Sequence, residues 1–295
     1  LKDIEIQGKN YVGSFIGYTS MTTITNITAN DITIIGTNYI GGIFGYKLYE
    51  GTTSTTLIGK ITADNITVTG TSYVGGILGY GVGHDITLTN SNITGQTRVG
   101  GILGSYDNCY NDQDLRNLSM QKTTIQGSKE YIGGIAGYLN VAYSCLQNTE
   151  IVECNIIGTT VDSNYVGGLS GWYDYFICNT NVRDSLISSQ GSYIGGIVGS
   201  NEKNYNNNYY YNFIQNTTIE GYSKVGGIVG QYTIGSIYHN YVNANINATG
   251  HTAGGIVGYL DNTGMTNANN VSNIYNNYVA GTTINAPEKV GGIIG

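Results

Sequence analysis

Charged residues and proline are scarce in this chain. Of its 295 residues, 11% are charged and 1 is proline, whereas about a quarter of the residues in an average soluble domain are charged. Low charge indicates disorder only when apolar residues are scarce as well. Here 40% of the residues are hydrophobic, largely Ile and Val, so we expect a folded, β-rich chain.

Long apolar runs and clustered basic residues are also missing. No stretch approaches the roughly 18 apolar residues of a membrane span, so we expect no membrane insertion. A net charge of -7, with 12 Lys and Arg spread along the chain, disfavours nucleic-acid binding. Residue 1 is Leu rather than Met, and LKDIEIQGKN lacks a signal-peptide core, so we expect a mature or excised segment, either part of a longer chain or a subunit that stacks end to end.

The four cysteines show no metal-binding pattern. They form no CxxC pair and have no histidine at zinc-ligand spacing, so we predict neither a metal nor a cofactor. Cys145 and Cys178 fall at nearly the same point of adjacent repeats. They are either a disulfide in an oxidising compartment or two small buried thiols, and the sequence leaves both open.

What is abundant is glycine, with 45 residues, and tyrosine, with 27. Many of them belong to one phrase that recurs at intervals of about 25 to 37 residues, within the range typical of solenoids. Its ten copies are YVGSFIG (from Tyr11), YIGGIFG (Tyr39), YVGGILG (Tyr73), RVGGILG (Arg98), YIGGIAG (Tyr131), YVGGLSG (Tyr165), YIGGIVG (Tyr193), KVGGIVG (Lys224), TAGGIVG (Thr252) and KVGGIIG (Lys289).

Between the phrases lie segments in which β-branched residues alternate with Thr or Asn, such as IGKITADNITV from Ile58. This period of two is typical of half-buried strands, and helical spacing is not evident. A unit of about 30 residues cannot bury a core alone and has to stack on its neighbours. We therefore predict one right-handed parallel β-solenoid over residues 1–295, of about ten coils.

The paired glycines have a role in this architecture. Stacked coils lie about 4.8 Å apart, so a Cβ at a narrow bend would collide with the adjacent coil. Val74 and Ile77 flank one pair and stand three positions apart, which a regular strand would point to opposite faces. We expect a bend at each glycine pair to turn both side chains inward.

The segment KVGGIVGQYTIGSIYHNYVNANINATG, residues 224–250, combines the glycine phrase with an Asn-bearing strand and a closing glycine. This combination resembles the GLUG-motif repeat of large bacterial surface proteins, which include immunoglobulin A peptidases. The resemblance covers essentially the whole chain. It implies a β-solenoid in an extracellular or cell-surface setting, and it implies no catalytic residues.

Two loops carry the candidate chemistry. Asp107, Asp112 and Asp114 share one loop and either bind calcium or form a solvated acidic loop. Arg116 beside them is the one faint candidate for a polysaccharide-cleaving site. A polar run, NEKNYNNNYYYN, occupies residues 201–212 of a second loop. The histidines His84, His239 and His251 are separate from one another and indicate no hydrolytic triad.

Tyrosines flank the glycine phrase on both sides, as in Tyr39 and Tyr46, and Trp172 is the partner of Tyr165. In a solenoid they would stack into aromatic ladders, which either stabilise adjacent coils or bind sugar rings or a partner. A shorter ladder of Thr28, Thr62 and Thr89 raises ice binding as an alternative to simple strand propensity.

These observations lead to two functional hypotheses. The first is a non-enzymatic extracellular scaffold, a stalk or filament component that self-associates end to end or joins neighbouring domains of a longer chain. The alternative is a cell-surface adhesin or glycan-binding protein that uses tyrosine ladders or loops.

Overall fold

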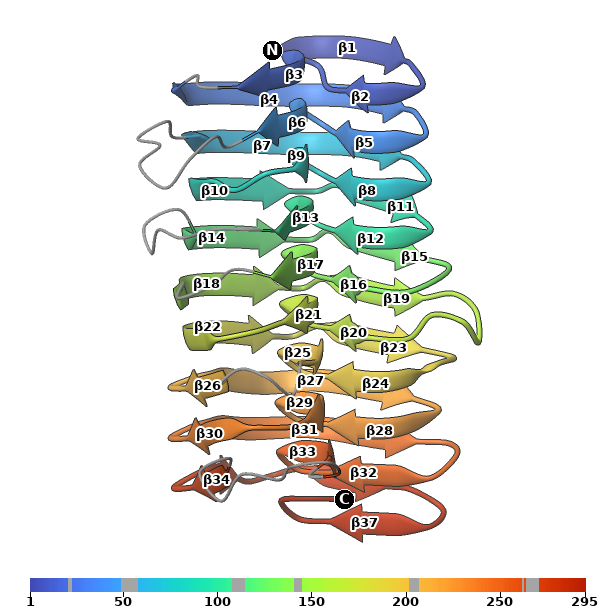
Figure 1. Ribbon diagram of the computed structural model, residues 1–295, viewed down its shortest axis with the longest axis vertical. Helices are drawn as coiled ribbons and strands as arrows, with labels where there is room; N and C mark the ends of the chain where they lie inside the picture. Colours follow the sequence, from blue (N-terminus) through green and yellow to red (C-terminus); the bar gives the residue numbers. More distant parts are fainter. Residues whose placement is uncertain are drawn as a thin grey trace.

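The computed structural model describes residues 1–20, 23–48, 58–107, 115–140, 145–201, 207–261, 263 and 271–295. Within these ranges the chain is all-β and contains no helix. Figure 1 shows the strands stacked as successive coils along one long axis, with the N-terminus at one end and the C-terminus at the other. The predicted parallel β-solenoid is confirmed.

Three sheets run along the solenoid. Sheet A comprises β1 (Lys2–Gln7), β4 (Ile24–Ile35), β7 (Ile58–Thr69), β10 (His84–Thr89), β11 (Asn92–Gly95), β14 (Arg116–Gln121), β15 (Thr124–Gly127), β18 (Cys145–Val152), β19 (Asn155–Gly158), β22 (Phe176–Arg183), β23 (Leu186–Ser189), β26 (Asn207–Tyr210), β27 (Phe213–Gly221), β30 (Gly235–Tyr238), β31 (Tyr241–Ala248), β34 (Ser272–Tyr275), β35 (Tyr278–Val279) and β36 (Thr283–Asn285).

Sheet B comprises β2 (Asn10–Val12), β5 (Asn38–Gly41), β8 (Ser72–Gly75), β12 (Thr97–Gly100), β16 (Ile132–Gly133), β20 (Val166–Gly167), β24 (Ser192–Gly195), β28 (Ser223–Gly226), β32 (Thr252–Gly254) and β37 (Lys289–Gly291). Sheet C comprises β3 (Ile16–Ser20), β6 (Phe44–Leu48), β9 (Leu78–Tyr80), β13 (Leu103–Asp107), β17 (Ala136–Asn140), β21 (Ser170–Tyr173), β25 (Val198–Ser200), β29 (Val229–Tyr232) and β33 (Val257–Leu260).

Each coil visits the sheets in the order B, C, A, and equivalent strands pair in parallel with the coils on either side. In sheet B, for example, Val99 of β12 lies opposite Val74 of β8 and Ile132 of β16. Each of the ten glycine phrases supplies one strand of sheet B, whereas sheet C has 9 strands among the described residues. Complete three-sided turns are therefore slightly fewer than the predicted ten.

The glycine bend lies between sheets B and C. In the third copy of the phrase, strand β8 ends at Gly75 and β9 begins at Leu78, with a bend between them. Val74 and Ile77 on either side are both fully buried, as predicted. A Cβ on Gly76 would overlap the carbonyl oxygen of Gly101 in the next coil. Glycine is needed at this position because the backbones of adjacent coils approach too closely to leave room for a Cβ.

The bend within sheet A uses residues other than glycine. In β7, the alternation of buried residues shifts between Ala63 and Ile66, and Asn65 at that point has a left-handed φ of 54°. Its equivalents in neighbouring coils share this conformation: Asp31 (φ 57°), Asn90 (φ 50°), Lys122 (φ 49°), Glu153 (φ 53°), Asp184 (φ 54°) and Asn216 (φ 47°). This left-handed column divides sheet A into two segments, each with its own inward face. A second left-handed column lies five residues before it, as at Lys60 and Asp85.

Candidate functional site

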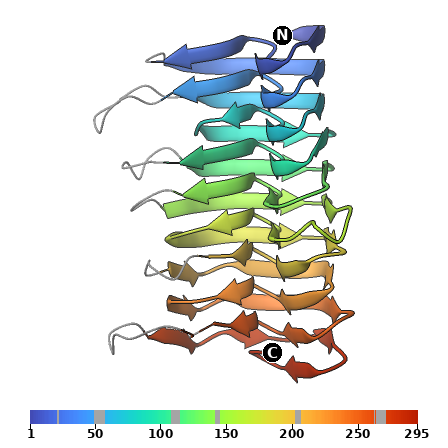
Figure 2. The same ribbon diagram turned by 45° about the vertical axis from the view of Figure 1, so that its right-hand side comes forward.

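Two columns of mostly aromatic side chains run along the outside of the glycine bend. The first aromatic column consists of the residues that open the first eight phrases: Tyr11, Tyr39, Tyr73, Arg98, Tyr131, Tyr165, Tyr193 and Lys224. The second aromatic column stands seven residues further on: Tyr18, Tyr46, Tyr80, Ser105, Tyr138, Trp172, Ser200, Gln231 and Tyr259. Figure 2 shows the sheet C strands that carry the second column lying one above another along the long axis.

The rings stack within each column and meet edge to face between the columns. The Tyr39 and Tyr73 rings stack at 4.4 Å between centroids, and the Tyr46 and Tyr80 rings stack at 4.7 Å. Across the bend, Tyr39 packs edge-on against Tyr46 at 5.1 Å. Both geometries are favourable for aromatic pairs. The predicted tyrosine ladders are therefore present, and Trp172 joins them by stacking on Tyr138 at 6.3 Å.

Arg98 replaces a tyrosine in the first aromatic column. Its guanidinium carbon lies 4.9 Å from the ring centroid of Tyr73 and 4.5 Å from that of Tyr138, so it makes a cation–π contact with both columns. The opposite position in its own coil is the small Ser105. An oxygen of the Asp107 carboxylate lies 3.6 Å from the guanidinium. The cation thus fills the space that two tyrosine rings occupy in other coils.

Lys224 makes the same replacement near the other end of the solenoid. Its ammonium nitrogen lies 4.3 Å from the centroid of Tyr193 and 4.4 Å from that of Tyr259. It also donates hydrogen bonds to the Tyr193 hydroxyl and to Oε1 of Gln231, each at 3.2 Å. At these two coils a positively charged side chain, rather than a tyrosine ring, contacts the rings of the coils on either side.

The first aromatic column is held in a costly backbone conformation. Tyr39 has a φ of 57°, and the other residues of the column share this left-handed region, which costs a non-glycine residue about 1–2 kcal/mol. Burial, followed by the nearby Tyr73, raises the pKa of Tyr39 to about 12. Burial also raises the pKa values of Tyr138 and Tyr165 to about 12. The phenols of these three tyrosines are thus partly buried in the surface.

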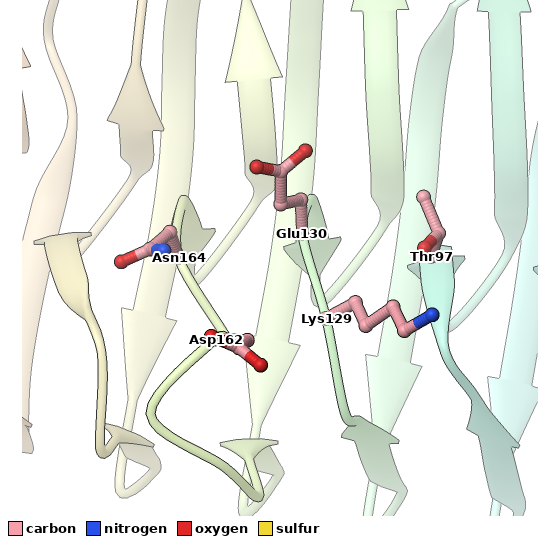
Figure 3. A pocket seen from close by; sticks show the side chains of 5 residues that line it. All are labelled: Thr97, Lys129, Glu130, Asp162 and Asn164. Carbon is pink, nitrogen blue, oxygen red and sulfur yellow. The ribbon is translucent and has the colours of Figure 1, made fainter.

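A polar hollow of about 250 Å³ adjoins the first aromatic column. It is lined by Thr97, Lys129, Glu130, Asp162 and Asn164, which directly precede three successive phrases in the sequence. In Figure 3 the Lys129 side chain extends toward Thr97, and the Glu130 carboxylate points away from Asp162. The two carboxylates do not converge, so the hollow lacks the geometry of paired acid and base groups on one substrate bond.

The predicted acidic loop is described only in part. Asp107 ends β13 beside Arg98, whereas Asp112 and Asp114 lie outside the described residues. Burial raises the pKa of Asp107, an effect that Arg98 partly offsets. Arg116 opens β14 in the next segment of sheet A. Over the described ranges, no three His, Cys, Asp or Glu side chains gather as metal ligands would.

The three histidines lie in three different surroundings. His84 is buried, and its Nδ1 lies 2.8 Å from the Asp85 carboxylate. His239 stacks on Tyr211 at 5.1 Å. His251 pairs with Glu288 at 2.9 Å. They are not brought together, in agreement with the sequence interpretation.

The threonine ladder differs from the predicted one in its third member. Thr28 lies opposite Thr62, but Thr62 lies opposite Thr87, and Thr89 lies opposite Asp64. The predicted place of Thr89 is therefore wrong. The left-handed residues set the register here, because Asn90 in this coil occupies the corner position that Asn65 occupies in the preceding one. The next residue of the ladder is Ser119.

The two cysteines at equivalent repeat positions are offset in register. Cys145 lies opposite Phe176, while Cys178 lies opposite Gln147, two residues away along β18. The strand pairing therefore does not place these two positions directly opposite each other. A third cysteine, Cys154, is fully buried, and burial raises the pKa of its thiol to about 11. It is held as a neutral thiol that donates to the Val152 carbonyl.

A column of buried asparagines was not expected from the sequence. The Asn240 side chain donates hydrogen bonds to the Tyr209 carbonyl at 2.9 Å and to Oδ1 of Asn277 at 2.9 Å. Its own Oδ1 accepts from the backbone and side-chain nitrogens of Asn212, each at 3.0 Å. A sequence pattern could have predicted this column. Asn212, Asn240 and Asn277 each stand directly beside an aromatic residue that forms strands, at intervals close to the repeat length.

Comparison with known proteins identifies no family. No protein-family model matches the chain, and no curated protein matches it. Among solved structures, the chain is similar to the crystal structure of "a putative immunoglobulin A1 protease from Bacteroides ovatus". The alignment has a TM-score of 0.46 and 15% sequence identity, and covers 87% of this chain and 78% of the other. The similarity to GLUG-motif repeats stays a prediction.

Proposed function

We propose that the chain is a non-enzymatic structural scaffold, a stalk or filament component at the cell surface or outside the cell. The observation that carries this proposal is the continuity of contacts between coils. Gly76 donates a backbone hydrogen bond to Gly101 at 2.9 Å, and Gly101 donates in turn to Gly134 at 2.8 Å. Side-chain ladders follow the same axis, as when Asn65 donates to Asp31 at 2.7 Å.

This continuity supports a load-bearing role. Separating two adjacent coils requires breaking the backbone bonds of all three sheets together with one layer of the buried core. The described residues contain no helix long and apolar enough to cross a membrane. The extracellular setting is the part of the proposal that comes from the GLUG resemblance.

Electron microscopy of the purified 295-residue chain tests the scaffold role. A filament component forms long uniform fibres, and a stalk segment forms short straight rods of one length. Flexible or collapsed particles would contradict both forms. A parallel screen for polysaccharide and peptide cleavage checks the non-enzymatic part, which fails if cleavage persists through purification and is lost in the double variant Asp112→Asn and Asp114→Asn.

A second candidate function is glycan binding by a cell-surface adhesin. The observation that favours it is a set of exposed aromatic side chains on the outer face of sheet A in the later coils. Phe213, Tyr275 and Tyr278 are 48%, 46% and 62% exposed. Aromatic side chains at a surface with polar neighbours are suited to stacking against sugar rings. A glycan array with the purified chain tests this candidate, which is abandoned if no glycan is retained.

A further inference from the structure

The outer face of sheet A carries a short aromatic row that ends abruptly. Phe213, Tyr241 and Tyr278 lie opposite one another on β27, β31 and β35. The Tyr241 and Tyr278 rings stack at 5.6 Å, and Phe213 is tilted by 34° from Tyr241 at 6.4 Å. On the other side of Phe213 the register places Asn181. The row therefore stops where an aromatic side chain gives way to a short amide.

This ending leaves a hollow beside Phe213. The hollow has a volume of about 380 Å³ and is lined by Asn181, Phe213, Gln215 and Tyr241, and this volume lies within the range of small-ligand sites. The only ring that Phe213 contacts in the described part of the chain is Tyr241. The ring face toward Asn181 is thus available to a ligand.

Two amide side chains border this ring face. Asn181 and Gln215 make no side-chain hydrogen bond with any described residue, and each offers both a donor and an acceptor. A hydroxyl group is likewise both donor and acceptor, so it can use either end of an amide. An anion or a cation would leave half of each amide unused.

Arg183, the charged residue beside the hollow in the strand register, is already paired with carboxylates. Arg183, which lies opposite Gln215, donates to Glu150 at 3.2 Å and to Asp184 at 3.3 Å. Neither of its partners lines the hollow. The lining itself is uncharged, which favours a neutral ligand.

From these features we infer that the hollow formed by Asn181, Phe213, Gln215 and Tyr241 binds one unit of a neutral saccharide. The C–H face of the sugar ring packs on the free face of Phe213, where its partial positive charge meets the negative face of the aromatic ring. The hydroxyl groups at the sugar's edge bond to the amides of Asn181 and Gln215. This inference goes beyond the scaffold role and rests on the second candidate function, glycan binding.

The test compares wild-type protein with two site variants and one control. Binding of the neutral oligosaccharides cellotetraose and chitotetraose is measured by saturation-transfer NMR and calorimetry. Phe213→Ala removes the stacking face, and we expect it to weaken binding at least about tenfold. Phe15→Ala is the matched control, because Phe15 is 50% exposed but lies at the other end of the solenoid. We expect it to leave binding unchanged.

A second variant, Asn181→Tyr, distinguishes loss of the binding site from loss of the fold, in case Phe213→Ala does not fold. A tyrosine at position 181 adds one ring to the row and fills the hollow, so we expect the folded solenoid to be kept and binding to be lost. If the wild type binds but both variants bind equally well, this site is wrong while glycan binding stands. If the wild type binds neither these probes nor any arrayed glycan, both proposals fail. Retention of an aromatic peptide instead of a sugar would also overturn the saccharide assignment.

Discussion

Single residues decide how the chain turns, and two kinds of residue do so for different reasons. Glycine appears where the backbones of adjacent coils come too close for a Cβ, as at Gly76. Tyr, Asn and Asp appear where the backbone enters the left-handed region, as at Tyr39 and Asn65. Asn and Asp tolerate that region, whereas Tyr persists there only because stacking above and below holds it in place.

A glycine variant tests the close approach. In Gly76→Ala the new methyl group overlaps the Gly101 carbonyl, and we expect a loss of about 3 kcal/mol in the free energy of unfolding, at the upper end of overpacking costs. Gly292 occupies the same place in the last phrase, and a Cβ there would have no neighbour within 4 Å. Gly292→Ala should therefore be nearly neutral. Urea unfolding measures both, and equal losses would refute the explanation.

A second variant tests the buried asparagine column. Asn240→Leu leaves the backbone nitrogen of Asn212 and the carbonyl of Tyr209 without their partner, and unpaired buried groups cost about 1–3 kcal/mol each. We expect a loss of at least about 2 kcal/mol. Asn273→Ala serves as the comparison, since Asn273 is exposed and makes no side-chain hydrogen bond to a described residue. A Leu variant as stable as the wild type would show that the column is dispensable.

At this scale the sequence predicts the glycine bends but not the other corners. The glycine pair is visible because it interrupts a strand pattern in nine of the ten phrases. The left-handed role of Tyr39 is invisible, because tyrosine is a strand former and nothing local marks it as a corner. The misplacement of Thr89 has the same origin, since the left-handed Asn90 fixes its register.

Among the elements, the aromatic columns depend most on cooperation between coils. The Tyr39 ring contacts Tyr11 and Tyr73 in its own column and Tyr46 across the bend, so that burial and neighbouring phenols raise the pKa of Tyr39 from 10.0 to about 12. The presence of these ladders could be predicted from the phrase itself. The cation–π contacts of Arg98 could not, because they join side chains of three different coils.

The raised phenol pKa values predict a loss of stability at high pH. Tyr39, Tyr138 and Tyr165 keep their protons to about pH 12 in the folded state, whereas unfolded tyrosine loses its proton near pH 10. Between these values the unfolded state binds fewer protons, so the free energy of unfolding falls as the pH rises. Urea unfolding from pH 8 to 12 should show a constant stability at first and a decline above about pH 10.

The replacement Tyr165→Phe provides the control for this decline. It keeps the ring but removes one ionisable phenol, so the variant should lose less stability than the wild type over the same interval. An absorbance titration of tyrosinate follows the ionisation directly. If all phenols titrate near pH 10 while the chain is still folded, the packing explanation is wrong.

At the scale of the whole molecule, the solenoid is a stack of interchangeable coils. Val166 lies opposite Ile132 on one side and Ile194 on the other, and neighbouring glycines align in the same way. The repeat in the sequence was sufficient to predict this architecture. The number of residues between the sheet C strand and the following sheet A strand varies from coil to coil. The pairing of Val166 with Ile132 and Ile194 in sheet B is not shifted by this variation.

Deleting one full repeat tests this modularity. Removal of residues 166–193 joins Tyr165 to Ile194, so that Ile132 gains Ile194 as its new partner. We expect the shortened chain to keep its β circular-dichroism signal per residue, because stability in such arrays depends on nearest neighbours. Removal of residues 166–192 leaves one extra residue and shifts the strand faces. We expect this second deletion to aggregate or melt far lower, and equal behaviour of the two would contradict the stacked-coil model.

The two cations in the first aromatic column matter for anything that lies lengthwise along the molecule. A run of like rings repeats at the coil spacing, so an elongated binder that slides by one coil meets the same surface again. Arg98 and Lys224 break this translational symmetry at two heights. Arg98 faces Ser105 and Lys224 faces Gln231, so the two ends of the solenoid differ along this surface. A long binder can therefore contact it in one position and one direction only.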